Sequence, residues 1–321
     1  MTDRPLDLFT LGEVMTLVRG TSVGPLRPGT AAEISFAGAE ATVAIVAGRL
    51  GHTAAWCGRV GADGSGEMIL AGLRAEGVEV SAAVIDPDQP TGLLLRHPRT
   101  ARTTAVAYHR EGKAGSRLLP SDIPEQPLRS ARILHITGIT PALSPSAAEA
   151  VDHAVRLARD AGVTVSLDVN YRQGLWPRER AAPVLRRLAA HADIVFAGTG
   201  EAALVLGAPD GTPPSELAAA LTALGPREAV LKLGAAGALT LSEDGIEQIG
   251  GLDVPVLDPV GAGDCFVGGY LSAVLDGLPA HRRLERGNLC GAYSVSTTGD
   301  WEGAPRRTEL AQLTAADNVL R

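Results

Sequence analysis

The stretch that most constrains this chain runs from Asp258 to Asp264 and reads Asp-Pro-Val-Gly-Ala-Gly-Asp. The residues that follow, Cys265-Phe-Val-Gly-Gly-Tyr-Leu271, are apolar at roughly helical spacing, so we expect the glycine turn to open a buried helix. Such a turn directs several free backbone N–H groups at one point, where the helix dipole also favours negative charge. The stretch therefore suits a phosphate or a developing phosphoryl oxygen.

Asp264 itself has two interpretations. If the loop only held an anion, the negatively charged carboxylate of Asp264 would repel that anion. The carboxylate is better explained as a base that takes a proton from an attacking hydroxyl. Alternatively the turn is a simple connection and Asp264 caps the helix, because Asp is a preferred N-cap residue. The spacing alone leaves both interpretations open.

Composition excludes several classes of protein. The 321 residues are 45% hydrophobic and 20% charged, which allows one large α/β domain with a sizeable core. The formal net charge of −7 and the lack of a dense Lys/Arg block do not favour a nucleic-acid partner. Cys57, Cys265 and Cys290 are far apart, which argues against a disulfide framework and a zinc site. No apolar run reaches membrane-spanning length and no signal core opens the chain, so we expect a cytoplasmic protein without a membrane partner.

Strands and helices are predicted to alternate along most of the chain. Apolar runs predict strands at 7–12, 53–60, 133–137, 163–168, 193–196, 229–233, 238–241 and 246–249. Helical patterns cover 38–51, 64–76, 144–161, 178–190, 201–206, 215–224, 265–275, 284–297 and 308–313. This order predicts an α/β fold with a doubly wound, mostly parallel sheet and helices on both faces. Without a repeat or a clear linker, residues 1–321 form one predicted domain, in which the segments near 13–36 and 91–113 make a small β-sheet lid.

Common catalytic motifs are absent. The chain has no Gly-x-x-x-x-Gly-Lys-Ser/Thr, no Gly-x-Gly-x-x-Gly after the first strand, no His-Glu-x-x-His and no Gly-x-Ser-x-Gly. P-loop, dinucleotide-binding, zinc-protease and serine-hydrolase chemistry are therefore not indicated.

Polar residues follow the predicted strand at 163–168. Asp168, Asn170 and Arg172 stand where that strand ends, and ligands of doubly wound sheets collect at the carboxyl ends of strands. The planar guanidinium of an arginine fits a carboxylate or a phosphate bidentately. The alternative is a loop in which Asp and Asn cap the backbone and the arginine is solvated.

The stretch from Asp258 to Asp264 resembles the C-terminal signature of the ribokinase-like (PfkB) sugar kinases. The resemblance implies a ribokinase-like fold with ATP and Mg²⁺ as cofactors, and it leaves open a monovalent cation as a further cofactor. It also implies that Asp264 is the catalytic base, and that the amides of Gly261, Ala262 and Gly263 form an anion hole.

Further segments resemble the 2-keto-3-deoxygluconate kinases of that family. These are Tyr108-His-Arg110 with Ala114-Gly-Ser116, the segment from His135 to Ser144, and Gly299-Asp-Trp-Glu-Gly-Ala-Pro305. The substrate-binding residues implied by the resemblance are Gly38, Tyr108, Arg110, Ile139, Arg172, Asp258 and Asp264. The implied nucleotide-binding residues are Asn170, Lys232, Gly234, Gly237, Gly261, Gly263 and Asn288. Glu201 would organise Mg²⁺ through water.

Three positions depart from the family pattern: Thr42 and Gly198 replace asparagines, and Leu94 replaces a lid tyrosine. They leave open a fructokinase-like or other neutral-sugar or nucleoside kinase, and a non-catalytic relative that binds a sugar. The expected partners are a sugar or sugar acid and ATP. A small lid sheet with exposed edges also predicts a homo-oligomer, a dimer through the lid or a higher assembly.

Overall fold

A computed structural model describes residues 6–100 and 103–310, and its centre is a nine-stranded sheet in the order β15-β14-β13-β12-β11-β10-β1-β4-β6. The pairings from β6 to β13 are parallel, and the last two, β13–β14 and β14–β15, are antiparallel. The strands are β1 (Leu8–Leu11), β4 (Ala54–Cys57), β6 (Val78–Glu79), β10 (Ile133–Thr137), β11 (Thr164–Asp168), β12 (Ile194–Gly198), β13 (Glu228–Lys232), β14 (Ala238–Ser242) and β15 (Gly245–Ile249). The predicted doubly wound, mostly parallel sheet is confirmed.

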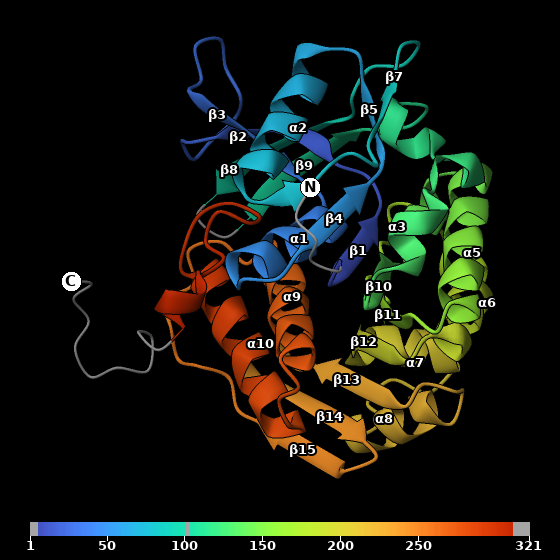
Figure 1. Ribbon diagram of the computed structural model, residues 1–321. Helices are drawn as coiled ribbons and strands as arrows, with labels where there is room; N and C mark the ends of the chain where they lie inside the picture. The colour runs from blue at the N-terminus through green and yellow to red at the C-terminus, as the bar shows by residue number, and fades with distance from the viewer. Residues whose placement is uncertain (1–5, 101–102, 311–321) are drawn as a thin grey trace.

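Helices cover both faces of this sheet (Figure 1). One face carries α1 (Ala39–Arg49), α2 (Gly64–Ala75), α9 (Ala262–Leu275) and α10 (Ala280–Val295). The other carries α3 (Glu125–Arg129), α5 (Pro145–Asp160), α6 (Arg178–His191), α7 (Thr199–Leu206) and α8 (Pro214–Thr222). The short α4 (Thr140–Leu143) immediately precedes α5. None of the helices within residues 6–100 and 103–310 has the length and apolar character needed to cross a membrane.

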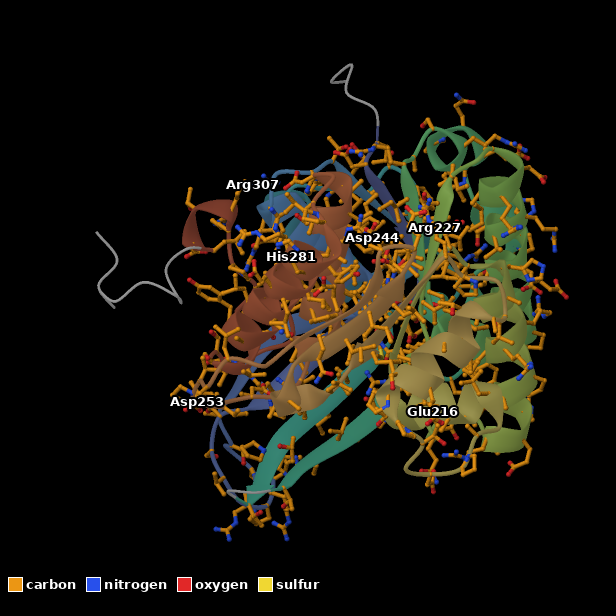
Figure 2. All side chains as sticks on the ribbon, turned by 90° about the horizontal axis from the view of Figure 1, so that it is seen from below. Glu216, Arg227, Asp244, Asp253, His281 and Arg307 are labelled. Carbon is orange, nitrogen blue, oxygen red and sulfur yellow. The ribbon has the colours of Figure 1, made fainter. Side chains whose placement is uncertain are left out.

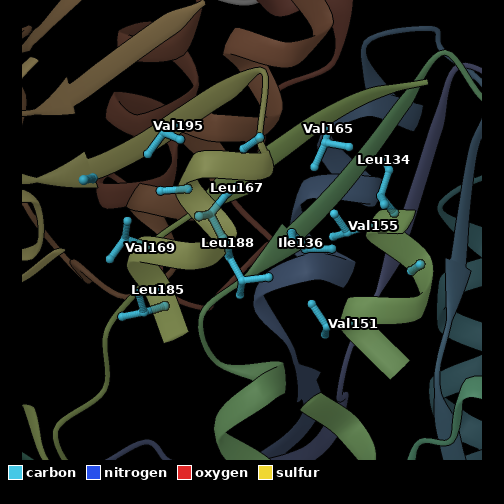
Figure 3. Close-up of a cluster of buried hydrophobic side chains, with 14 of the residues drawn as sticks. Leu134, Ile136, Val151, Val155, Val165, Leu167, Val169, Leu185, Leu188 and Val195 are labelled. Carbon is cyan, nitrogen blue, oxygen red and sulfur yellow. The ribbon is translucent and has the colours of Figure 1, made fainter. Parts of the chain in front are cut away.

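The strands are apolar along their length because both of their faces are buried. In β12, Val195 packs in the core on the α5 side, while Phe196 belongs to the core on the α9 side. There Phe196 meets Phe266 and Tyr270 edge to face, with ring centroids 6.4 and 5.2 Å away. On the α5 side the core is mostly aliphatic (Figure 3), and burial of each such side chain stabilises the fold by about 1.5–3 kcal/mol.

Local sequence explains where α5 begins. Ser144 has an extended backbone and accepts a hydrogen bond from the amide of Ala147 at 3.1 Å, while Pro145 occupies the first helical position. Val151 and Val155 then recur on one face and are buried against the sheet (Figure 3).

A second, small sheet has the order β3-β2-β8-β9 and uses both predicted lid segments. Its strands are β2 (Met15–Gly20), β3 (Ala32–Ala37), β8 (Leu93–Thr100) and β9 (Thr103–His109). β8 and β9, both from the second of these segments, form an antiparallel hairpin, which Figure 2 shows in teal projecting from the body of the molecule. We call these four strands the small sheet.

The structure differs from the predicted elements in three places. The strand predicted at 53–60 is broken at Gly58 into β4 and β5 (Arg59–Gly61), which belong to different sheets. At the break the backbone of Gly58 lies against the carbonyl of Gly12 with no room for a Cβ. β5 pairs with β7 (Val84–Asp86), which was not predicted. Other short elements were also missed, because they have too few residues to show a hydrophobic period. They are β6, α3, α4 and the 3₁₀ turns Ala114–Arg117, Pro120–Asp122 and Gly234–Ala236. Of the helix predicted at 308–313 the structure shows a 3₁₀ turn at Arg307–Glu309, and residues 311–313 lie outside the described residues.

Candidate active site

The glycine turn opens α9 as predicted, and its geometry depends on Gly261. This residue is the N-cap of α9 with a φ of 78°, and a Cβ on it would clash with the carbonyl oxygen of Asp300. The first intrahelical hydrogen bond runs from the amide of Cys265 to the carbonyl of Gly261 at 2.8 Å. The amides of the first turn therefore have no intrahelical acceptor, which is the arrangement that binds anions.

The alternative in which Asp264 caps the helix is wrong. Gly261 is the N-cap, and Asp264 is the third residue of α9. Its carboxylate instead accepts a hydrogen bond at 3.0 Å from Nδ2 of Asn170, a residue in the loop after β11. Burial raises the pKa of the Asp264 carboxyl, and the nearby cations of Arg172 and Lys232 only partly offset that rise. A desolvated carboxyl with a raised pKa is a better proton acceptor than an ordinary aspartate.

We expect Gly261→Ala to impair both folding and catalysis. A non-glycine residue in this left-handed conformation costs about 1–2 kcal/mol, and the clash with Asp300 adds to that cost. The measurements are the denaturant midpoint and kcat. Gly277→Ala is the matched control, because Gly277 has a φ of 71° with no atom within 4 Å of an added Cβ. Equal effects of the two substitutions would contradict the role of the close approach to Asp300.

A lysine and an aspartate meet at the carboxyl ends of two strands of the main sheet. Nζ of Lys232, at the end of β13, lies 2.7 Å from both carboxylate oxygens of Asp168, at the end of β11. Burial alone would lower the pKa of Lys232, but the carboxylates of Asp168, Glu201 and Asp264 outweigh it and raise the pKa above its usual value. The ammonium group therefore stays charged, and it lies 3.7 Å from where a Cβ of Gly263 would be. The anion-binding turn thus has a fixed cation beside it.

A cavity of about 900 Å³ lies between the small sheet and the main sheet and contains Asp264. The predicted site residues that line it are Gly38, Tyr108, Arg110, Ile139, Arg172, Gly261 and Asp264. Asp258 does not line it, because its carboxylate is held by Arg96 and by the amides of Val260 and Gly299. The structure therefore brings most of the predicted substrate residues together around the predicted base.

The two arginines predicted to bind the substrate, Arg110 and Arg172, differ in their surroundings. Nε of Arg110 donates to Oε2 of Glu13 at 2.7 Å, and its guanidinium lies 5.4 Å from the ring centroid of Tyr108. Glu13 is only 3% exposed, and burial raises the pKa of its carboxyl while Arg110 opposes the rise. Arg172 is exposed, and within the described chain its guanidinium makes no hydrogen bond or ion pair. Arg172 is therefore the arginine that is free to bind an incoming anion.

Three of the predicted nucleotide-binding residues, Gly234, Gly237 and Asn288, lie near the ends of β13 and β15. Gly234 and Gly237 form the turn after β13 with positive φ values, and a Cβ on Gly237 would clash with the carbonyl of Ile249. Nδ2 of Asn288, on α10, donates to the carbonyl of Gly250 at 3.1 Å. Gly237 and Asn288 thus lie against the same backbone segment, Ile249–Gly250. Asn170 lies apart from them, on Asp264, and has a φ of 37°, the one positive value that the described non-glycine residues show.

Glu201 is held by backbone amides at the start of α7. Its Oε2 accepts from the amide of Gly198 at 2.7 Å and its Oε1 from that of Tyr171 at 2.9 Å. This bonding needs no side chain at position 198, so the departure from asparagine leaves the position of Glu201 intact.

The residues around Asp264 fit an Mg²⁺ ion carried by a nucleotide. In the part of the chain that the structure describes, no group of three or more His, Cys, Asp or Glu side chains forms a metal cage. Mg²⁺ in nucleotide sites is held by one or two carboxylates together with phosphate oxygens and water. Burial raises the pKa of Asp168, and the nearby carboxylates of Glu201 and Asp264 add to that rise while Lys232 opposes it. Glu201 and Asp264 therefore lie close together and can supply the required negative charge.

Two departures from the family pattern have different surroundings. Leu94 lines the cavity and is the register partner of Tyr108 across β8 and β9, so an apolar side chain replaces a hydroxyl there. Thr42 is buried in α1 and is not part of the cavity wall.

Four buried charged residues that line the cavity were not identified from the sequence: Glu13, Glu40, Arg96 and Asp300. Glu40 accepts hydrogen bonds from the hydroxyls of Thr137 and Thr140 at 2.6 and 2.7 Å. A lone acidic residue at the start of the apolar helix α1 was a usable signal for Glu40. Nothing local distinguishes Arg96 or Glu13 from solvated residues.

This fold and this site define a phosphotransferase with an alcohol acceptor. Residues 6–307 match the pfkB family of carbohydrate kinases, and the chain belongs to that family. It is 36% identical to the 2-dehydro-3-deoxygluconokinase of Bacillus subtilis (strain 168), over 98% of this chain and 97% of the relative. It is 35% identical to the enzyme of the same name from Thermoproteus tenax, over 97% and 95% of the two chains.

A solved structure shows the same fold. A putative ribokinase II from E. coli, in complex with ATP and Mg²⁺, superimposes with a TM-score of 0.88 at 26% identity, covering 96% of this chain and 99% of that one. The predicted family and ribokinase-like fold are confirmed.

Proposed function

We propose that the protein transfers the γ-phosphoryl group of ATP to the primary hydroxyl of 2-keto-3-deoxygluconate (2-dehydro-3-deoxygluconate) or a closely related keto-sugar acid. The observation that carries the acid specificity is the free guanidinium of Arg172 in the wall of the cavity that contains Asp264. An unpaired arginine beside the predicted base can bind the carboxylate of a sugar acid bidentately. The names of the relatives from Bacillus subtilis and Thermoproteus tenax support the same substrate class.

In the proposed reaction Asp264 accepts the proton of the attacking hydroxyl. The first-turn amides after Gly261 face the charge that develops on the transferring group, and the ammonium of Lys232 lies beside them. When bound with ATP, Mg²⁺ supplies further neutralisation of the phosphate charge. Arg172 holds the sugar carboxylate, while Glu13 orients Arg110 toward Tyr108 and keeps that part of the cavity wall neutral.

The raised pKa of Asp264 predicts the pH dependence of kcat. A base acts only when unprotonated, so activity is full above its pKa and is lost as the pH falls through it. Because the pKa of Asp264 is raised from 3.8, we expect an acid limb with an apparent pKa above 3.8, to which the neighbouring carboxyls contribute. The measurement is kcat from about pH 4.5 to 8, with stability followed in parallel.

A change in folding stability caused by the titration of Asp264 would not produce the same loss of kcat at low pH. A carboxyl whose pKa is higher in the folded state contributes stability at low pH and loses it as the pH rises through the folded pKa. A flat kcat across the acid range would contradict the assignment of Asp264 as base.

The experiment that tests the proposal is a coupled ATP-to-ADP assay over sugar acids and neutral sugars. Turnover confined to 2-keto-3-deoxy sugar acids would support it, and turnover on neutral sugars would replace it with a fructokinase-like activity. Leu94 favours that second candidate, because it places an apolar side chain next to Tyr108 in the cavity. Sugar binding without turnover would indicate a non-catalytic relative. The homo-oligomer, the monovalent cation and the cytoplasmic location stay predictions.

A further inference from the structure

Arg96 is a buried arginine that joins the small sheet to the main body of the protein. It lies on β8 and is 3% exposed. Its Nη2 donates to Oδ2 of Asp258 at 2.8 Å, and its Nη1 lies 3.0 Å from Oδ1 of Asp300. One guanidinium therefore faces two carboxylates from segments outside the small sheet.

Both carboxylates belong to segments that shape the glycine turn. Asp258 also accepts the amide of Val260 at 3.2 Å and the amide of Gly299 at 3.1 Å, so it connects the start of the turn to the loop after α10. The carbonyl of Asp300 is the atom against which Gly261 packs. Arg96 is thus connected to the anion-binding turn in two ways. One is through Asp258 at the start of the turn, and the other is through Asp300, whose carbonyl packs against Gly261.

The same strands carry cavity residues. Leu94, two positions before Arg96 on β8, and its register partner Tyr108 both line the cavity, as does Val106, the register partner of Arg96. Any shift of β8 relative to the turn would move these side chains relative to Asp264.

We propose that Arg96 is a positioning residue that holds the small sheet in register with the glycine turn, so that a sugar seated against β8 and β9 presents its hydroxyl to Asp264. Only the kinetic test of this inference rests on the proposed sugar phosphorylation.

The two contacts of the Arg96 guanidinium, one with Asp258 and one with Asp300, differ. The contact with Asp258 is a hydrogen bond, whereas Nη1 of Arg96 and Oδ1 of Asp300 make an ion pair without hydrogen-bond geometry. Burial raises the pKa of Asp300 to about 7 although Arg96 opposes the rise, so Arg96 supplies the charge that favours its ionised form.

Arg19 provides a matched control. It is the register partner of Arg96 on the neighbouring strand β2, and it pairs with Glu33 inside the small sheet. It does not line the cavity, and within the described residues its guanidinium makes no hydrogen bond or ion pair with the glycine turn. Removing it takes one arginine from the same sheet without breaking the connection to the main body.

The kinetic test compares Arg96→Met, Arg96→Lys and Arg19→Met, with 2-keto-3-deoxygluconate and MgATP. A misplacement of about 1 Å costs roughly 100-fold in rate, so we expect kcat to fall by about that factor in Arg96→Met. The KM for ATP should change by less than about threefold, and Arg96→Lys should recover part of the rate because it keeps one charged contact. Arg19→Met should retain the wild-type kcat. A folded Arg96→Met with kcat within about threefold of wild type would overturn the proposal.

A second test needs no substrate and separates this inference from the proposed function. Hydrogen exchange of the free protein should increase in Arg96→Lys at β8 and also at residues 258–264 and 298–302, while Arg19→Met should affect β2 and β3 alone. Exchange changes confined to the small sheet in Arg96→Lys would overturn the positioning role even if Arg96→Met does not fold. If the wild type phosphorylates no sugar acid, the proposed function fails, and the exchange result still decides the role of Arg96.

Discussion

Replacing Asp264 with asparagine is expected to reduce kcat by about 10²–10⁴-fold while leaving the fold and sugar binding intact. The replacement keeps the shape of the side chain and still accepts the hydrogen bond from Asn170, but it cannot accept a proton. It also removes a carboxylate whose burial is unfavourable, as its raised pKa shows, so we expect no loss of folding stability. The measurements are kcat in the coupled assay and the sugar dissociation constant by calorimetry.

The control for this substitution is Asp210→Asn, because Asp210 is exposed and lies between α7 and α8, away from the cavity. It should change neither quantity. If Asp264→Asn kept kcat within about tenfold of wild type, Asp264 would not be the base, and the glycine turn alone would have to account for catalysis. A large loss of sugar affinity would instead assign Asp264 a binding role.

Arg172→Gln is expected to lower kcat/KM selectively for sugar acids. A hydrogen bond to a charged group contributes about 1.5–3 kcal/mol, which corresponds to roughly 10- to 150-fold. Neutral sugars lack the carboxylate, so their kcat/KM should change little. Arg172 is exposed and unpaired within the described residues, so the folded state loses no hydrogen bond or ion pair when it is replaced.

The pH of this second experiment matters, because Arg172 also lowers the pKa of Asp264. Its removal raises that pKa further, so both substrate classes should be compared well above the acid limb, at about pH 8. Arg156→Gln, at an exposed position of α5, is the control. An equal loss for sugar acids and neutral sugars would contradict carboxylate recognition and would favour the neutral-sugar kinase.

The features predicted correctly from the sequence depend on local chemistry. Gly261 could be placed in a turn at a helix start because glycine adopts a positive φ without strain and the apolar spacing of the following residues marks a helix. Asp168, Asn170 and Arg172 could be placed at one edge of the sheet because parallel strands end together. The pattern could not distinguish a cap from a base at Asp264, since both occur within the first turn of a helix.

The charge pairing of the site could not be predicted in the same way. Arg110 and Arg172 look alike in the sequence, but Glu13 neutralises Arg110 from a distant segment and leaves Arg172 free. Asp258 was expected at the substrate, but Arg96, 162 positions earlier in the chain, holds its carboxylate.

The sequence by itself determined the alternation of strands and helices, the glycine turn and the family, because periodicity, turn chemistry and short motifs are properties of neighbouring residues. The tertiary structure alone decided which charges are neutralised, which arginine remains available and how the small sheet is held against the turn. An ion pair requires its two groups to be a few ångströms apart, and for residues separated by more than a hundred positions that distance exists only once the chain has folded.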